Sequence, residues 1–369
     1  MKEQKHKKVI ISGGGTGGHI FPAISVANAL RRMDPGIEIL FVGAEGRMEM
    51  VKVPAAGYKI VGLPIRGLYR NLSPKNVLVL YKLIKSLFLA RKIISAFNPD
   101  VVVGVGGYAS GPVLKQAGKM GIPPLIQEQN SYAGVTNKLL AKKASAICVA
   151  YDGMEKYFPA DKIIKTGNPV RQNFDDIDIL KNEALAFFRL KRNSPVILVL
   201  GGSLGAGTIN KSLSENFQKI AGSGCQWLWQ TGKYYFENIN SLVSESSYPD
   251  IAVHAFINRM DYAFAAADII ISRAGAGTIS ELCLVGKPVI LVPSPNVAED
   301  HQMKNALALS YRNAAIMIRD DEAENRLVDE AVKLISDTEE KKSLSANIRM
   351  MADRDADIRI AKEILKLAN

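Results

Sequence analysis

The sequence predicts an α/β protein with two doubly wound, parallel-sheet domains that face each other across a cleft. Short apolar runs that are typical of buried strands alternate with helical periodicity along most of the chain. The 369 residues are enough for two domains, and 47% of them are apolar, so large cores can form. A strand, a glycine-rich turn and a helix begin each half, first at residue 9 and again at residue 196. The ligand loops of such domains lie at the carboxyl ends of the strands.

Two series of strands define the expected domains. The first series comprises residues 9–12, 37–42, 59–61, 101–105, 124–127, 146–149 and 162–166. The second comprises residues 196–200, 226–230, 251–256, 268–271 and 288–292, and helical sequence is expected from about residue 300 to the end. Between the two series, a loop at 167–171 leads into a polar stretch, which places the boundary there. We therefore expect one domain over 1–167 and a second over 168–349.

The glycine-rich stretch 12–22 follows the first strand and opens a helix expected over 22–30. Glycine lets a ligand approach the main chain, and a helix N-terminus favours an anion, so this turn predicts a phosphate site. Gly13, Gly15 and Gly18 also fit the dinucleotide pattern G-x-G-x-x-G. That pattern requires an acidic residue at the end of the next strand, and the acidic residue 45 comes two positions too late, so an NAD or FAD site is disfavoured. A tight turn without a ligand remains the structural alternative.

Charge and cysteine usage narrow the range of partners and compartments. The formal net charge of +11 suggests anionic partners such as phosphorylated substrates or acidic lipid headgroups. The chain has no recognisable nucleic-acid motif, so nucleic acid is disfavoured as a partner. The three cysteines, Cys148, Cys225 and Cys283, lie in or beside apolar runs without pairing or metal-ligand spacing, which fits a reducing cytoplasm. The basic N-terminus lacks the apolar core of a signal peptide.

A long amphipathic segment over 73–99 stands out in the first half. Apolar residues recur at helical spacing from Val77 to Phe88, and lysines form a narrow stripe at positions 75, 82, 85 and 92. These charges interrupt the segment too often for a membrane span. Two interpretations stay open, namely a basic, apolar helix in the membrane interface and a crossover helix that covers the sheet, and one helix can do both.

Four further stretches place polar or glycine-rich loops before helices. They are residues 104–112, 128–134, 272–281 and 299–305, and the sequence shows no nucleophilic triad, metal-ligand cluster or Walker lysine. Together with the first loop, they resemble the MurG family of peptidoglycan N-acetylglucosaminyltransferases over essentially the whole chain. The resemblance rests on seven motifs in order: Gly-Gly-Thr-Gly-Gly-His at 14–19, Gly-Gly-Tyr-x-Ser-Gly at 106–111, Glu-Gln-Asn at 128–130, Asn-Pro-Val-Arg at 168–171, Gly-Gly-Ser at 201–203, Ala-Gly to Ser-Glu at 274–281, and His-Gln at 301–302.

The resemblance implies a fold and a reaction. The fold is GT-B, with two Rossmann-like domains, and the C-terminal helix at about 350–369 packs back on the first domain. The N-terminal domain binds the acceptor, and the C-terminal domain binds UDP-GlcNAc. N-acetylglucosamine passes, with inversion, from UDP-GlcNAc to the C4 hydroxyl of the muramyl sugar in undecaprenyl-pyrophosphoryl-MurNAc-pentapeptide (lipid I), which yields lipid II. No cofactor and no metal ion are implied.

The same resemblance implies a location and partners. Because the acceptor is a membrane-embedded diphosphate, the protein is expected to be peripheral at the cytoplasmic face of the cell membrane. Implied partners are UDP-GlcNAc, lipid I, the anionic inner-leaflet surface, and cell-wall synthesis or division proteins. A UDP-GlcNAc 2-epimerase of the same fold is an alternative, which the basic apolar helix and the first glycine loop disfavour. A non-catalytic sugar-nucleotide-binding subunit is another, which the presence of acceptor-type and donor-type motifs in one chain disfavours.

His19 is the leading candidate for the general base. It begins a helix, and the helix dipole is expected to lower the pKa and keep the imidazole neutral. A neutral imidazole can accept the proton of the acceptor hydroxyl. A histidine that only packs the helix start is the structural alternative. Glu128 is the rival base, or else it orients Asn130 or pairs with a lysine.

The family motifs imply contacts to both substrates. Residues that match donor contacts are Thr16, Gly17, Gly18, Asn130, Arg171, Ser203, Ile257, Ala276, Gly277, Thr278, Ile279, Ser280, Glu281 and Gln302. Residues expected on the acceptor side are Gly14, Gly15, Gly106, Gly107, Tyr108 and Ser110. Arg171 suits the diphosphate of the leaving UDP, unless it forms a hinge salt bridge. Ile257 matches a residue whose backbone reads uracil. Glu281 matches a carboxylate that accepts the ribose hydroxyls, although Thr278-x-x-Glu281 also fits a capping box.

Overall fold

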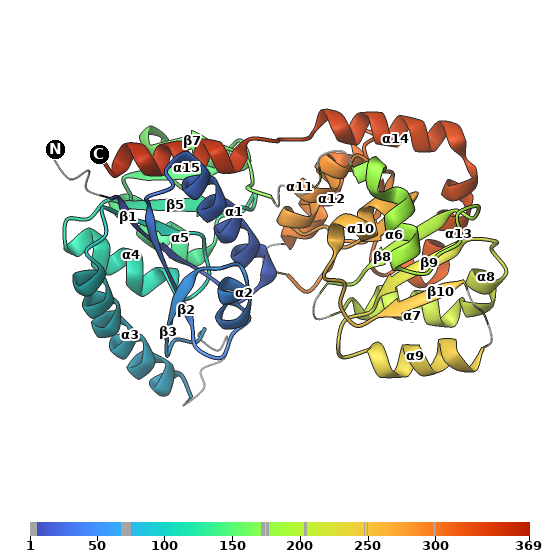
Figure 1. The fold of residues 1–369 in the computed structure, drawn as a ribbon, viewed down its shortest axis with the longest axis horizontal. Coiled ribbons are helices and arrows are strands. Elements are labelled where there is room, and N and C mark those ends of the chain that lie inside the picture. Colours follow the sequence, from blue (N-terminus) through green and yellow to red (C-terminus); the bar gives the residue numbers. More distant parts are fainter. Residues whose placement is uncertain are drawn as a thin grey trace. The chain divides into compact units, whose positions relative to one another are not determined.

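The computed structural model describes residues 6–67, 75–170, 174, 177–202, 205–246, 248, 250–297 and 300–369, with the side chains of 75 and 76 excepted. The chain divides into two compact units, one formed by Met1–Arg171 with Arg354–Asn369 and the other by Gln172–Asp353. Each unit has its own parallel sheet, as Figure 1 shows. The predicted fold class, with two doubly wound parallel sheets, is therefore confirmed.

The first unit contains a seven-stranded sheet with the order β3-β2-β1-β4-β5-β6-β7. Its strands are β1 (Lys8–Ser12), β2 (Glu38–Ala44), β3 (Lys59–Leu63), β4 (Val101–Gly104), β5 (Pro124–Glu128), β6 (Ala146–Val149) and β7 (Ile163–Lys165). The order reverses between β1 and β4, and Ser12 pairs with Gly104, so the carboxyl ends of these two strands lie side by side. Doubly wound sheets bind their ligands at such a switch point.

Helices cover both faces of this sheet. They are α1 (Gly17–Met33), α2 (Glu49–Ala55), α3 (Lys75–Phe97), α4 (Ser110–Lys119), α5 (Val135–Leu140) and α15 (Ala356–Leu367). Alternate residues of β1 point to opposite faces, because Val9 and Ile11 pack with α1 and α15, whereas Ile10 packs with α3 and α4. Through Ile360 and Ile364, the C-terminal helix α15 belongs to the core of the first unit.

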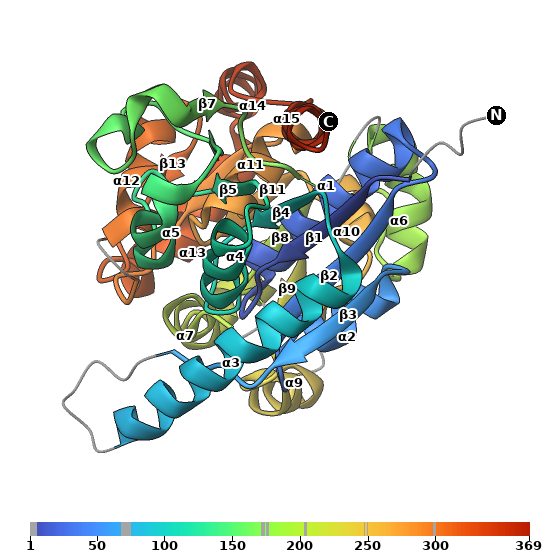
Figure 2. The same ribbon diagram turned by 90° about the vertical axis from the view of Figure 1, so that its left-hand side faces the viewer.

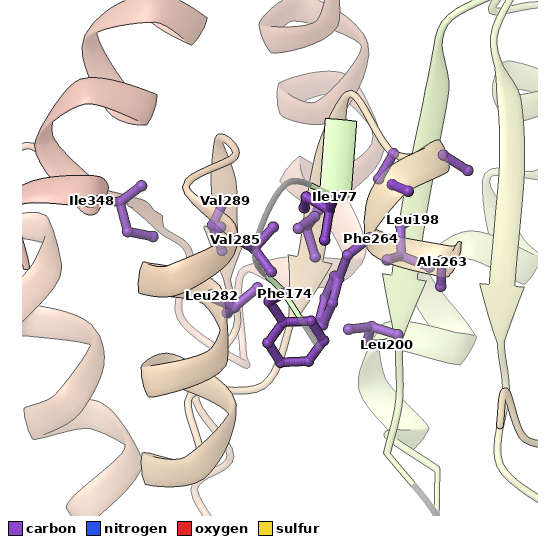
Figure 3. Packing of buried hydrophobic residues seen from close by; sticks show 14 of the residues in the cluster. Phe174, Ile177, Leu198, Leu200, Ala263, Phe264, Leu282, Val285, Val289 and Ile348 are labelled. Carbon is purple, nitrogen blue, oxygen red and sulfur yellow. The ribbon is translucent and has the colours of Figure 1, made fainter. Parts of the chain in front are cut away.

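The second unit contains a six-stranded sheet with the order β10-β9-β8-β11-β12-β13. Its strands are β8 (Val196–Leu200), β9 (Gln226–Gln230), β10 (Ile251–His254), β11 (Ile269–Ser272), β12 (Val289–Leu291) and β13 (Ile316–Met317). Its helices are α6 (Lys181–Phe187), α7 (Gly207–Glu215), α8 (Phe217–Ala221), α9 (Phe236–Glu245), α10 (Met260–Ala266), α11 (Ala276–Val285), α12 (His301–Ser310), α13 (Ala323–Ser336) and α14 (Thr338–Met350). Figure 3 shows one of its core clusters, in which the Phe174 and Phe264 rings meet edge to face with centroids 5.2 Å apart.

The expected strands are all present, with ends that differ by no more than two residues. The prediction of helical sequence from about residue 300 to the end is wrong at β13, because a two-residue edge strand leaves no pattern in the sequence. The helix expected over 22–30 begins earlier, at Gly17, so that His19 lies in its first turn. The helix α3 confirms the helical interpretation of 73–99. Within the described part of the chain, no helix is long and apolar enough to cross a membrane.

Candidate active site

Two glycine loops interlock at the switch point of the first unit. One follows β1, and the other follows β4. The Gly14 N–H donates to the Gly106 carbonyl oxygen at 3.3 Å, and a Cβ on Gly107 would lie 2.4 Å from the Gly14 carbonyl oxygen. Gly14 and Gly107 have φ angles of +147° and +85°, which residues with side chains rarely adopt. The two loops therefore approach so closely that only glycine fits at these positions.

His19 lies at this junction, in the first turn of α1. Its imidazole covers Gly106, where a Cβ would be 2.8 Å from His19 Nε2. Thr16 Oγ1 and His19 Nδ1 are 3.3 Å apart. Burial lowers the pKa of His19 below its usual value, and the carboxylates of Glu128 and Glu49 oppose this shift. The expected direction of the pKa shift is confirmed, but burial, not the helix dipole, is its main cause. The imidazole is therefore neutral near pH 7 and can accept a proton.

Glu128, the other candidate base, ends β5 and is 3% exposed. Its Oε1 accepts hydrogen bonds from the main-chain N–H and the side-chain amide of Asn130, at 3.1 and 3.2 Å. Its Oε2 accepts from the Gly134 N–H at 2.9 Å and from Asn137 Nδ2 at 2.8 Å. Both carboxylate oxygens are thus occupied, and they fix the loop that presents Asn130. This geometry suits the orienting role of Glu128 better than the role of base.

Two further acceptor-side candidates lie in and after the loop that follows β4. Ser110 is buried, and its hydroxyl donates to the Gly107 carbonyl oxygen at 2.8 Å. Tyr108 is exposed, and it lies beside Gly67, where a Cβ would be 2.4 Å from the tyrosine oxygen. Ser110 therefore supports the loop from inside, whereas the Tyr108 ring faces solvent.

In the second unit, the corresponding loop follows β8. The Gly201 N–H donates to the Gln230 carbonyl oxygen at 3.0 Å. Gly205, at φ +85°, packs against the Tyr235 ring. Ile257 is buried, and its N–H donates to Gln230 Oε1 at 2.9 Å. A contact of the Ile257 backbone with a base therefore has to use its carbonyl oxygen.

The stretch 276–281 forms the first turns of α11, after the carboxyl end of β11. The helix begins at Ala276 and has Gly275 as its N-cap. Thr278 is therefore the third helical residue, and the capping-box alternative for Glu281 is wrong, because that motif requires Thr278 at the N-cap. The first three N–H groups of the helix have no intrahelical acceptor, and they can bind an anion.

Gln302 lies in the first turn of α12. Its Oε1 accepts hydrogen bonds from the Ala274 N–H at 3.2 Å and from the Ser294 N–H at 2.9 Å. The side chain thus ties together the loops that follow β11 and β12, and its amide nitrogen carries two further donors. The Ser280 hydroxyl donates to the Ala276 carbonyl oxygen at 3.0 Å, within α11.

The structure also shows charged groups beside these loops to which the sequence motifs assigned no role. Arg273, after β11, pairs with Asp320, and the Thr208 hydroxyl donates to the same carboxylate at 2.8 Å. In the first unit, Glu49 accepts the Gly15 N–H at 2.9 Å. Their partners are main-chain atoms or residues distant in sequence, so no local motif marks these groups.

The candidate residues divide between the two units. Arg171 and Ser203 lie outside the described residues. The first unit holds Thr16, Gly17, Gly18, Asn130, His19, Glu128 and the acceptor-side candidates Gly14, Gly15, Gly106, Gly107, Tyr108 and Ser110. The second unit holds Ile257, Ala276, Gly277, Thr278, Ile279, Ser280, Glu281 and Gln302. They follow the carboxyl ends of β1, β4 and β5 in the first unit and of β10, β11 and β12 in the second, and doubly wound sheets bind ligands at this edge.

Comparisons with known proteins agree with this arrangement. The chain matches the glycosyltransferase family 28 N-terminal domain over residues 9–149 and the family 28 C-terminal domain over residues 196–360. A protein from Parabacteroides distasonis is 60% identical over 98% of both chains, and it is named UDP-N-acetylglucosamine–N-acetylmuramyl-(pentapeptide) pyrophosphoryl-undecaprenol N-acetylglucosamine transferase. The crystal structure of Acinetobacter baumannii MurG is 28% identical and superposes with a TM-score of 0.73, over 98% of this chain and 99% of that one.

A second solved structure bears on the fold alone. It is a UDP-GlcNAc 2-epimerase from Neisseria meningitidis, which superposes with a TM-score of 0.70 over 98% of this chain and 100% of that one. Its sequence identity is 17%, so the likeness concerns the two-sheet architecture and not the chemistry.

Proposed function

The chain belongs to glycosyltransferase family 28, and we propose that its two units divide the reaction into an acceptor side and a donor side. The enzyme transfers N-acetylglucosamine from UDP-N-acetylglucosamine to lipid I and forms lipid II in peptidoglycan synthesis. The observation that carries this function is the 60% identity to a transferase of that name over 98% of the chain. It favours the transferase over a same-fold epimerase and over a non-catalytic sugar-nucleotide-binding subunit.

His19 acts as the general base in this proposal. Its neutral imidazole takes the proton of the C4 hydroxyl of the muramyl sugar as that oxygen attacks the anomeric carbon of N-acetylglucosamine. The new glycosidic bond forms opposite the breaking bond to UDP, so the configuration inverts, and UDP leaves with the bonding electron pair. Support comes from the position of the imidazole at the switch point and from its lowered pKa. Glu128 holds the Asn130 loop and is not assigned the proton transfer.

The start of α1 is the proposed anion site of the acceptor side. The N–H groups of Gly13, Gly14 and Gly15 donate to acceptors inside the unit. In the first turn of α1, the His19 N–H donates to the Thr16 carbonyl oxygen at 3.1 Å, which leaves the N–H groups of Gly17 and Gly18 without an intrahelical acceptor, and the helix dipole there favours a phosphate. The glycines before the helix therefore shape the site, whereas Gly17 and Gly18, which the family motif matches to donor contacts, are assigned here to the phosphate of the acceptor.

The second unit binds the donor in this proposal. The Glu281 carboxylate accepts the ribose hydroxyls, the Ile257 carbonyl oxygen reads the uracil, and the Gln302 amide contacts N-acetylglucosamine. The free N–H groups at the start of α11 suit the diphosphate. By their motifs, Arg171 and Ser203 are assigned to the same diphosphate, whose charge rises as UDP leaves.

The first half of α3 is the proposed membrane contact. Val77, in this half, is 74% exposed, and Phe88, just past the middle of the helix, is 72% exposed, whereas Ile94, near the C-terminal end, is fully buried in the core. Figure 2 shows the first half of α3 projecting beyond the edge strands of its own sheet. The helix thus covers the sheet with one half and presents apolar side chains between lysines with the other. We place the protein peripherally at the cytoplasmic face of the membrane, where lipid I is embedded among anionic headgroups.

A defined reaction tests the activity. Purified protein is incubated with labelled UDP-GlcNAc and a short-chain lipid I analogue, and the expected product is a lipid-linked disaccharide with release of UDP. A muramyl pentapeptide without lipid and diphosphate is the matched control, and it should react poorly because it lacks the anionic and apolar groups. UDP release without disaccharide, or conversion of the donor to its 2-epimer, would contradict the proposal.

A further inference from the structure

Glu49 is a buried carboxylate that belongs to no motif of the active site. It is the first residue of α2 and is 1% exposed. Its Oε2 accepts the Gly15 N–H at 2.9 Å, and its Oε1 accepts the Ala44 N–H at 2.9 Å. A buried carboxylate is unfavourable unless it is hydrogen-bonded, and here main-chain groups from two neighbouring strand ends supply those bonds.

Two glycines make room for this carboxylate. A Cβ on Gly14 would lie 2.2 Å from Glu49 Oε1, and a Cβ on Gly43 would lie 2.6 Å from Glu49 Cγ. The turn that Glu49 holds contains Gly14 and Gly15, at φ +147° and +90°, and glycine loses more conformational freedom than any other residue when it is ordered. The carboxylate therefore fixes a turn that would otherwise sample many conformations.

A short chain of contacts leads from Glu49 to His19. Glu49 binds the Gly15 N–H, the preceding Gly14 N–H binds the Gly106 carbonyl oxygen, and Gly106 lies under the imidazole. A shift of the turn after β1 therefore moves the surface on which the imidazole rests.

We propose that Glu49 is a positioning residue for the transfer reaction, because its carboxylate holds the glycine turn on which His19 depends. The proposal rests on the proposed role of His19 as the base. Glu49 and Glu128 are the described charged groups that act on the imidazole, from the start of α2 and the end of β5, and the loop after β4 contributes main chain at Gly106. Both carboxylates stabilise the imidazolium that forms when the hydroxyl proton is transferred.

Two substitutions separate the geometric role of Glu49 from its charge. Glu49→Gln keeps the length but removes the charge, and it turns an NH2 group toward one of the two N–H donors. We expect kcat to fall about 10- to 100-fold, with the KM for UDP-GlcNAc unchanged, and the acidic limb of the pH profile to move to lower pH. Glu49→Asp keeps the charge but cannot reach both N–H groups. We expect kcat to fall, while the acidic limb stays in place.

Glu45→Gln is the matched control, because it removes the same charge from an exposed side chain four residues earlier. Its kcat and pH profile should equal those of the parent protein. A Glu49→Gln enzyme with unchanged kcat, or with a lower kcat and an unmoved acidic limb, would overturn the proposal.

Two measurements test the inference independently of enzyme turnover. The chain has four histidines, so the imidazole resonance of His19 can be assigned with His19→Ala and titrated by NMR. The pH at the midpoint of this titration should be lower in Glu49→Gln than in the parent protein and unchanged in Glu49→Asp. An unchanged midpoint in Glu49→Gln would count against the proposal. If His19→Ala keeps full turnover, the base assignment fails, while this titration still reports whether Glu49 acts on His19.

The second measurement needs no variant and applies even if Glu49 variants do not fold. Gly15 is exposed, yet its N–H is bound to Glu49. Hydrogen exchange of the parent protein should show a Gly15 amide protected like the core strands. A Gly15 amide that exchanges like an open loop would refute the proposal.

Discussion

Both units place a glycine-rich turn between a central strand and a helix, but different side chains hold the turn in place in each unit. In the first unit, the turn after β1 is held by the buried Glu49 carboxylate, which accepts the Gly15 N–H at 2.9 Å. In the second unit, the turn after β8 packs against Tyr235, since a Cβ on Gly205 would be 2.6 Å from the ring and one on Gly207 would be 2.8 Å from its hydroxyl oxygen. One turn is therefore held by a charge and the other by a neutral ring.

The difference fits two different tasks. A carboxylate beneath a turn repels an anion bound in that turn and stabilises a neighbouring imidazolium. The first turn is thus suited to support His19, and a phosphate there is confined to the N–H groups of α1 beyond it. A neutral ring does not oppose a diphosphate, so the second turn is suited to receive the nucleotide. Two similar turns can therefore serve proton transfer on one side and diphosphate binding on the other.

The most severe test of this division is His19→Ala. We expect kcat to fall about 10²- to 10⁴-fold, the usual contribution of a general base, while the affinity for UDP-GlcNAc stays the same. In the parent enzyme, the acidic limb of kcat/KM should lie below the usual histidine pKa, because burial lowers the pKa of His19. Steady-state rates and calorimetric titration with UDP-GlcNAc measure both effects. His6→Ala, at an exposed position of the same unit, is the control. If the affinity for UDP-GlcNAc fell by as much as kcat, the proposal that the base and the donor site belong to different units would be contradicted.

A second test asks whether only the first unit contacts lipid. Replacing Leu80, Ile84 and Phe88 with Gln removes exposed apolar surface from α3. Since a fully buried apolar side chain contributes about 1.5–3 kcal/mol, we expect the loss of three to weaken binding to anionic vesicles by at least about 100-fold, with little change in Tm. Tyr311→Gln, at an exposed position of the second unit, should leave vesicle binding unchanged. Lower stability with unchanged vesicle binding would assign this face to the core.

Most strands of both units could be predicted from the sequence, because strands buried on both faces consist of apolar residues. Strands such as Val196–Leu200 are buried on both faces, so they appear as continuous apolar runs. The edge strand Ile316–Met317 is too short to leave such a run. Motif spacing also identified His19 and the loop of Glu128. Glu49 was missed because it follows other charged residues and its partners are main-chain N–H groups, which leave no trace in the sequence.

Glu128→Gln tests whether Glu128, the other buried carboxylate near His19, holds its loop through hydrogen bonds. In either orientation, the new amide turns its NH2 group toward two of the four donors that Glu128 now accepts. Leaving buried polar groups unpaired costs about 1–3 kcal/mol, so the urea midpoint should fall accordingly. Glu155→Gln removes an exposed charge from the same unit and should leave the midpoint unchanged. An unchanged midpoint for Glu128→Gln would mean that these hydrogen bonds do not hold the loop.

The prediction with the smallest expected effect tests whether the Tyr235 ring holds the turn after β8. Tyr235→Ala removes the ring that packs against Gly205 and Gly207, so the turn after β8 should loosen and the KM for UDP-GlcNAc should rise about tenfold, equivalent to about 1.4 kcal/mol. The kcat should change little, because the base lies in the other unit. Tyr235→Phe keeps the ring and should be close to the parent enzyme, and Tyr311→Ala removes an exposed tyrosine from the same unit as a control. This signature is the reverse of that expected for Glu49→Gln, in which kcat falls and the donor KM is kept. If Tyr235→Ala instead lowers kcat at constant KM, the two turns do not serve separate tasks.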